Sequence, residues 1–364
     1  MRERTVAHSN SSTLARYLLA AYILLVAYAS LHPLQGWHDR GASLLAFLEP
    51  TFPRYITAFD VIINVAAYIP LGFLVAASAH PVRWMPAGVV LATIASIALS
   101  GSMEALQTLL PNRVSSHLDF VLNAAGGLIG GLVGAWFAPR LIDNAAAVRF
   151  RRSWFRADAR TDLGLVIVAL WLLTQFNPET LLFGTGSLRG VLETVPGTLH
   201  DAHVFVGAEA MVSAAHLVAI GLFIGTLVHP RRSILAVIIV VVATALVLRM
   251  IAFATLFAPE NMFRWATVGA LEGFAAGVVI LLLIAPLKPS IRIVIACLFL
   301  MFATALVNLV PGNPYTANAL KVWRQGHFLN FNGLTGFVST LWPFLALAYL
   351  MLATIPARRW DRDS

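Results

Sequence analysis

Residues 234–257 read ILAVIIVVVATALVLRMIAFATLF, a continuous apolar run that holds one charged side chain, Arg249. A helix needs about 20 residues to cross the hydrocarbon core of a bilayer, and this run is long enough. Strands of a membrane barrel alternate apolar and polar residues, which this run does not do. The stretch therefore predicts the fold class, an all-α integral membrane protein.

Further apolar runs extend this prediction along the chain. The composition agrees, because 12% of the 364 residues are charged and 59% are hydrophobic, whereas soluble domains carry about 25% charged residues. This composition excludes a soluble enzyme and predicts a polytopic helical bundle of about ten transmembrane helices. The predicted spans are 14–31, 61–79, 87–108, 120–138, 163–176, 206–228, 234–257, 265–285, 293–310 and 334–355.

A basic segment separates the spans into two groups. We predict a four-helix membrane domain over residues 1–140, a basic cytoplasmic linker over 141–161 and a second membrane domain of about six helices over 162–364. A shift of 149 residues aligns Asp60 with Glu209 and gives five identities nearby. The second domain is either a degenerate repeat of the first or unrelated to it.

Lysine and arginine residues predict the orientation, because cytoplasmic loops hold the excess of them. With the N-terminus inside, the inner segments carry 16 of these residues and the outer loops carry 7. We therefore expect both termini in the cytoplasm. The segment Ala27-Tyr28-Ala29 resembles a signal-peptide cleavage site, but we expect the first helix to stay attached.

Polar residues gather at the predicted outer ends of the second, third and fourth spans. Each end brings a carboxylate and an amide three or four residues apart, which places the two on one helix face. Polar groups are costly inside a membrane, so such a cluster indicates a binding site. In the alternative interpretation, the acids cap helix ends or form interfacial ion pairs. The candidate binding residues are Asp60, Asn64, Glu104, Gln107, Arg113, His117, Asp119 and Asn123.

Other residues indicate structure more than chemistry. Gly126, Gly130 and Gly134 form a row that lets helices approach closely. Arg249 and Glu272 lie in neighbouring predicted spans and are candidates for an ion pair. The one cysteine allows no disulfide within the chain. We expect no metal ion, no cofactor and no nucleic-acid partner.

The spacing of the polar residues and glycines resembles that of the VanZ-like family over about residues 14–138. The matching pattern is Asp60-x3-Asn64-x5-Pro70-x-Gly72, then Glu104-x2-Gln107, then Arg113-x5-Asp119-x3-Asn123-x2-Gly126-x3-Gly130. Some members carry an aspartate three residues after the arginine, where this chain has Ser116. The resemblance implies a protein of the bacterial cell envelope in the inner membrane, with an influence on susceptibility to glycopeptides such as teicoplanin.

Three classes of function fit these residues. The first is a protein that binds the head group of a glycopeptide or of a lipid-linked wall precursor. The second is an intramembrane enzyme in which Glu104 and Asp119 share acid–base work on a lipid-linked envelope substrate. The third is a transporter of lipid or solute. The sequence contains no recognisable nucleophile, which favours the first class, with membrane lipid as the surrounding partner.

Overall fold

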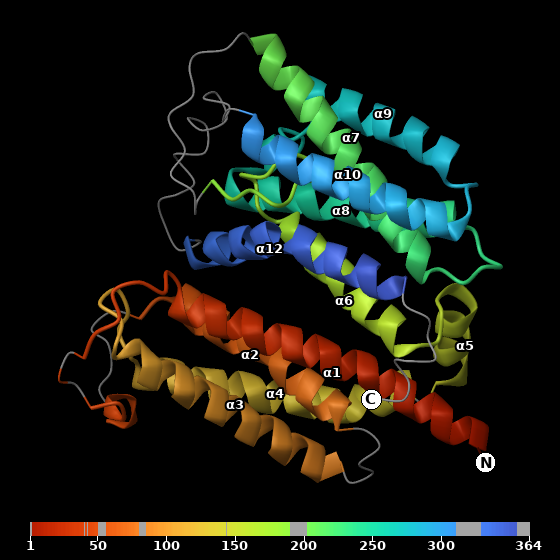
Figure 1. Cartoon of the computed structure of the whole chain (residues 1–364). Coiled ribbons are helices and arrows are strands. Elements are labelled where there is room, and N and C mark those ends of the chain that lie inside the picture. Colours follow the sequence, from red (N-terminus) through yellow and green to blue (C-terminus); the bar gives the residue numbers. More distant parts are fainter. Residues whose placement is uncertain are drawn as a thin grey trace. The chain divides into compact units, whose positions relative to one another are not determined.

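The computed structural model describes residues 2–39, 41, 43–49, 56–79, 85–142, 144–189, 202–310 and 329–354. These residues form eleven α-helices and no named strand (Figure 1). The predicted all-helical fold is therefore confirmed. The chain divides into two compact units, Met1–Ser153 with Ala157–Val166 and Trp154–Arg156 with Ile167–Ser364.

Eight helices of the described residues are long and apolar enough to cross a membrane. They cover Thr13–Leu31, Ala58–Ser78, Pro86–Gln107, His117–Ile142, His203–Leu227, Ile234–Leu256, Pro289–Leu309 and Phe331–Ala353. The other two predicted spans are shorter helices, α6 (Ala159–Thr174, 16 residues) and α9 (Val268–Ile284, 17 residues). The polytopic membrane fold is thus confirmed, with two helices below the usual transmembrane length.

The first unit is built on four long helices. Its elements are α1 (Arg2–Leu31), the 3-10 turn η1 (Ala46–Leu48), α2 (Ala58–Ser78), α3 (Met85–Gln107), α4 (His117–Ile142) and the short helix α5 (Ala145–Trp154). α4 packs against both α2 and α3, and α1 covers α2. Small buried clusters join α1 to the others, such as Val26 with Tyr68 and Leu71.

Glycines set the close approach between α4 and its neighbours. Gly126, Gly130 and Gly134 lie against the backbone of α2, and a Cβ atom on Gly130 would overlap the carbonyl group of Ile69. The alternate glycine Gly127 lies against α3. The packing role predicted for this row is confirmed. The row brings the polar ends of α2, α3 and α4 close together.

The second unit is arranged around α7. Its helices are the second half of α6, from Ile167, then α7 (Ala202–Leu227), α8 (Ile234–Leu256), α9, α10 (Pro289–Leu309) and α12 (Leu329–Ala353), with a 3-10 turn η2 (Pro259–Asn261). Within the membrane-spanning part of α7, 83% of the most apolar stretch is buried. α9 lies along α7 through Gly269, Gly273 and Gly277, which touch the α7 backbone (Figure 1).

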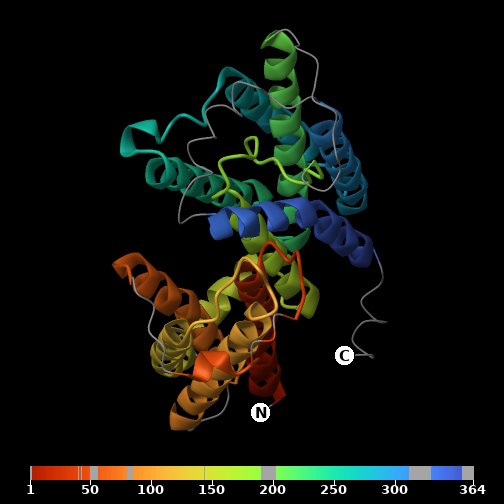
Figure 2. The same cartoon turned by 90° about the vertical axis from the view of Figure 1, so that its left-hand side faces the viewer.

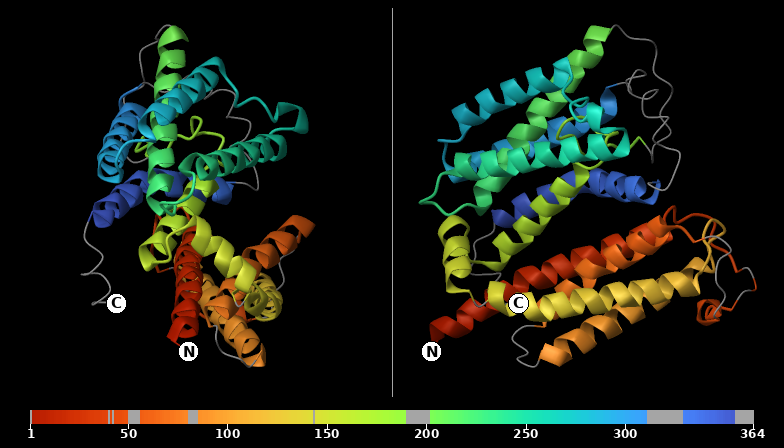
Figure 3. Two further views of the ribbon diagram at one scale, coloured as in Figure 1. Left: turned by 90° about the vertical axis from the view of Figure 1, so that its right-hand side faces the viewer. Right: turned by 180° about the vertical axis from the view of Figure 1, so that it is seen from behind.

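A non-helical stretch enters the second unit between α6 and α7. We call residues 175–189, QFNPETLLFGTGSLR, the inserted segment. Most of its residues are buried, and it lies among α7, α8, α10 and α12 (Figures 2 and 3). Irregular backbone inside a membrane protein is stable only where protein or water satisfies its hydrogen bonds. In this protein, polar side chains of the surrounding helices form hydrogen bonds with the backbone of the inserted segment.

Arg249 of α8 binds the first half of the inserted segment. Its guanidinium donates to the Asn177 carbonyl oxygen at 2.7 Å, to Thr180 Oγ1 at 2.9 Å and to the Thr180 carbonyl oxygen. Among the described residues, the anticipated ion pair with Glu272 is not formed. Glu272 is exposed on α9, whereas Arg249 is 3% exposed.

Two side chains bind the second half of the inserted segment. His216 Nε2 accepts the N–H group of Thr185 at 3.0 Å, while its Nδ1 lies 2.9 Å from a carbonyl oxygen of its own helix. The Asn308 side chain accepts from Leu188 N at 2.7 Å and donates to the Gly186 carbonyl oxygen at 2.8 Å. An amide side chain therefore takes the place of a neighbouring strand.

Gly186 fits a position that only glycine can occupy. Its φ is +84°, a region that side-chain-bearing residues avoid, and a Cβ atom would lie 2.7 Å from Pro343 Cγ. Its N–H group donates to the carbonyl oxygen of Ser339 at 2.8 Å. Proline has no N–H group, so Pro343 leaves that carbonyl without its helical partner. The break in the α12 hydrogen bonds thus supplies the acceptor for the inserted segment.

Candidate functional site

Asp60 lies in the first turn of α2 and caps it. Its carboxylate accepts hydrogen bonds from Thr57 Oγ1 at 2.6 Å and Thr57 N at 3.3 Å, and Thr57 Oγ1 accepts from Asp60 N at 3.1 Å. This reciprocal pair is a capping box, which satisfies two backbone N–H groups at the start of the helix. The structure therefore places Asp60 in the capping role that was the alternative interpretation.

Asn64 and Asp119 join α2 to α4. Asn64 Nδ2 donates to Asp119 Oδ1 at 2.9 Å, across 55 residues of sequence. Both side chains are half-buried, and each lies near the polar end of its helix. The contact brings together two of the three acid–amide pairs.

Glu104 of α3 is buried, with 3% of its surface exposed. Its Oε2 accepts a hydrogen bond from Ser116 N at 2.8 Å, and Ser116 Oγ accepts from Asp119 N at 3.3 Å. Ser116 therefore joins the two carboxyl-bearing residues. Ser116 is not among the predicted site residues, although a serine three residues before an acid is the signature of a helix N-cap.

One helical turn further along α4, Asn123 continues the polar contacts into the bundle. Its Nδ2 donates to Ser100 Oγ of α3 at 3.0 Å, and both residues are buried. Asn123 Oδ1 and Ser96 Oγ are buried and have no hydrogen-bond partner within the described parts of the chain. A buried polar group without a partner costs about 1–3 kcal/mol, so this depth suits water or a polar ligand group.

Gln107 and Arg113 bind the end of α1. Gln107 Nε2 donates to the Ser30 carbonyl oxygen at 3.0 Å, and Arg113 donates to the carbonyl oxygens of Ala29 and His32 at 3.0 and 2.9 Å. The last carbonyls of a helix lack intrahelical partners and carry partial negative charge, which a guanidinium complements. Burial lowers the pKa of Arg113. The pKa of His32 is also lowered, mainly by burial and to a smaller extent by the positive charge of Arg113.

His117, the last of the predicted site residues, contacts the turn η1. Its Nδ1 lies 3.0 Å from the carbonyl oxygen of Phe47 in η1, so it fixes the turn above the bundle. The contacts thus separate two groups of residues. We call Asn64, Glu104, Asp119 and Asn123, with Ser100 and Ser116, the polar centre. Asp60, Gln107, Arg113 and His117 hold helix ends and the turn around it.

The polar centre is not arranged as a metal site. No group of three or more His, Cys, Asp or Glu side chains that could hold a metal ion occurs in the part of the chain that the structure describes. Its carboxylates and amides instead offer hydrogen-bond acceptors and donors to a polar group.

The fold and these contacts define an all-helical membrane protein with a polar centre among three helices of its first unit. Residues 6–138 match the model of the VanZ/LLP1 family, and all eight predicted site residues lie within this range. The resemblance predicted from the spacing is therefore confirmed over this segment, which is a VanZ-like domain. No match was found among curated proteins or among solved structures.

Proposed function

We propose that this chain is a multi-pass protein of the bacterial cytoplasmic (inner) membrane, with both termini in the cytoplasm, whose polar centre binds a head group at the outer face. The VanZ/LLP1 match supports a role in the cell envelope. The association of the VanZ-like family with teicoplanin resistance supports an effect on glycopeptide susceptibility. The proposed ligands are the drug itself or a lipid-linked cell-wall precursor.

The observation that carries this proposal is that Glu104 and Asp119 both contact Ser116. The Glu104 carboxylate accepts from Ser116 N, and the backbone N–H of Asp119 donates to Ser116 Oγ. Neither acid has a Lys, Arg or His side chain within ion-pair distance among the described residues. A buried carboxylate without a countercharge is costly, and a positive group beside it offsets part of that cost. Amino sugars and peptide amines carry such an ammonium group.

Substitution by the matching amide tests the proposal, because it removes the charge and keeps the shape. In a susceptible bacterial host, we expect the wild-type chain to raise the minimal inhibitory concentration of teicoplanin several-fold. Glu104→Gln and Asp119→Asn should return it to the value of the empty vector, with the amount of protein in the membrane unchanged.

The matched control is Glu260→Gln, which removes a carboxylate from an exposed turn of the second unit. This variant should protect as well as the wild type. The proposal fails if Glu104→Gln and Asp119→Asn both protect fully while present in the membrane, or if the wild type gives no protection.

A further inference from the structure

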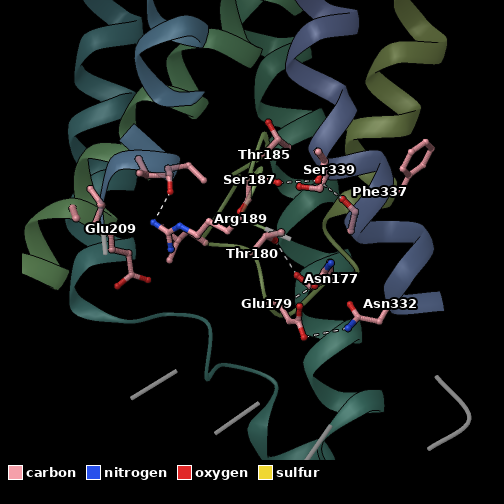
Figure 4. A pocket seen from close by; sticks show the side chains of 18 of the residues that line it. Asn177, Glu179, Thr180, Thr185, Ser187, Arg189, Glu209, Asn332, Phe337 and Ser339 are labelled. Carbon is pink, nitrogen blue, oxygen red and sulfur yellow. Dashed lines mark hydrogen bonds between the residues drawn. The ribbon is translucent and has the colours of Figure 1, made fainter. Parts of the chain in front are cut away.

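The second unit contains a cavity between the inserted segment and three helices, α7, α10 and α12 (Figure 4). Its volume is about 420 Å³. Cavities of about 300–1,000 Å³ are typical of small-molecule sites. The described lining residues run from Asn177 to Thr340, so all of them lie outside the VanZ-like segment.

Two opposite charges line this cavity without neutralising each other. Arg189 comes from the inserted segment and Glu209 from α7 (Figure 4). The Arg189 guanidinium has five N–H donors, and with described residues it makes one hydrogen bond, to the Val307 carbonyl oxygen at 2.6 Å. Within the described residues, no carboxylate lies within ion-pair distance of it. Arg189 therefore keeps N–H donors available to a ligand. The Glu209 carboxylate accepts a hydrogen bond from the Thr267 side chain, and its remaining lone pairs can accept a further donor from a ligand.

Within the part of the chain that the structure describes, the charges around the cavity balance. Glu179 lies at its edge, where Asn332 Nδ2 donates to its carboxylate at 3.2 Å. Behind Glu209, the buried Arg249 guanidinium is close enough to interact with it electrostatically. Among the described residues, two carboxylates and two guanidinium groups thus lie at the cavity or directly behind its wall. A ligand with a net charge would upset this balance, whereas a ligand that carries one charge of each sign would preserve it.

The remaining wall is mostly apolar. The apolar side chains that line it are Phe205, Val212, Val307 and Phe337. Some hydroxyl groups at the cavity already make hydrogen bonds within the protein. Thr340 Oγ1, for example, donates to the Ser187 carbonyl oxygen at 2.9 Å. An apolar wall with a few placed charges orients a small ligand that has carbon between its charged ends.

We propose that this cavity binds a small zwitterion, whose ammonium group meets Glu209 and whose anionic group meets Arg189. Both a free amino acid and the phosphoethanolamine head group of a phospholipid have this chemistry. The proposal concerns the second unit and is independent of the function proposed for the VanZ-like domain.

Equilibrium dialysis with the purified full-length chain in detergent tests the proposal. The probes are L-alanine and glycerophosphoethanolamine, compared with ethanolamine and glycerol phosphate, which each carry one of the two groups. We expect one of the two zwitterions to bind at one site, and both single-charge probes to bind at least tenfold more weakly. Binding of alanine indicates a free amino acid as the ligand. Binding of glycerophosphoethanolamine, with phosphatidylethanolamine retained in native mass spectra, indicates the lipid.

Charge-removing variants assign the binding to this cavity. Glu209→Gln and Arg189→Gln should each weaken the zwitterion at least tenfold, whereas Glu260→Gln and Arg264→Gln, in an exposed turn of the same unit, should leave its dissociation constant unchanged. If Arg189→Gln does not fold, Glu209→Gln decides, because it keeps the size of the side chain. The proposal is overturned if neither zwitterion binds, or if a folded Glu209→Gln variant binds as the wild type does.

Discussion

Arg249 shows how one side chain holds an irregular segment in place. Its planar guanidinium reaches three acceptors on Asn177 and Thr180 at once, which a lysine ammonium on a flexible stem does not reproduce. We expect Arg249→Lys to lower the free energy of unfolding by about 1–3 kcal/mol, because at least one buried acceptor loses its donor. Thermal unfolding of the purified protein in detergent measures this loss.

Arg264→Lys is the control, because Arg264 is exposed. Its unfolding midpoint should equal that of the wild type. Equal midpoints for Arg249→Lys and the wild type would show that charge alone, and not the fork of donors, stabilises the inserted segment.

Residue types predicted the polar centre better than they predicted its surroundings. An acid and an amide four residues apart at the ends of α2 and α4 predicted that these two ends face each other. The hydrogen bond between Asn64 and Asp119 agrees with this prediction. The partners of Arg113 did not follow from the sequence, because they are backbone carbonyls of α1, and any residue type supplies a carbonyl. For the same reason, nothing in the sequence indicated Arg249 as a ligand of backbone oxygens.

At the scale of elements, the contact between α2 and α4 depends on the absence of side chains. Gly130→Ala places a methyl group against the Ile69 carbonyl, and overpacking of this kind costs about 1–3 kcal/mol. We therefore expect a lower thermal midpoint for this variant, together with loss of the glycopeptide phenotype.

Gly88→Ala in α3 is the matched control. A Cβ atom there meets its nearest neighbours at 3.9 Å, an ordinary contact, and alanine favours a helix over glycine. This variant should be as stable as the wild type or more so. If both alanine variants behave alike, the backbone of α4 does not lie as close to α2 as the structure places it.

Length and hydropathy predicted the long helices because a membrane span is a local property of about 20 residues. Residues 177–189 of the inserted segment fell in the connection between two predicted spans, and Pro178, Gly184 and Gly186 are residue types typical of turns. Its burial depends on partners elsewhere in the chain, such as Asn308, which lies 120 residues after Leu188. A local pattern does not contain such contacts.

At the scale of the whole molecule, the distribution of positive charge predicts the orientation. In a Cys297→Ser background, we expect Glu260→Cys to react with a membrane-impermeant maleimide on intact cells, and Ala146→Cys to react only after permeabilisation. Both positions are exposed, so accessibility depends on the side of the membrane. The Cys297→Ser parent should not be labelled. The reverse pattern would place the polar centre at the cytoplasmic face and contradict the proposed function.

The contact between Gly186 and Ser339 has a consequence for biosynthesis. The inserted segment has no helix of its own to offer the translocon, and the carbonyl group that receives the N–H of Gly186 lies in α12, which leaves the ribosome after the other described helices. Until α12 has been synthesised, the nascent chain holds residues 175–189 without that acceptor. The second unit therefore completes its interior only after translation of α12, and a chain that stops before α12 leaves this interior incompletely packed.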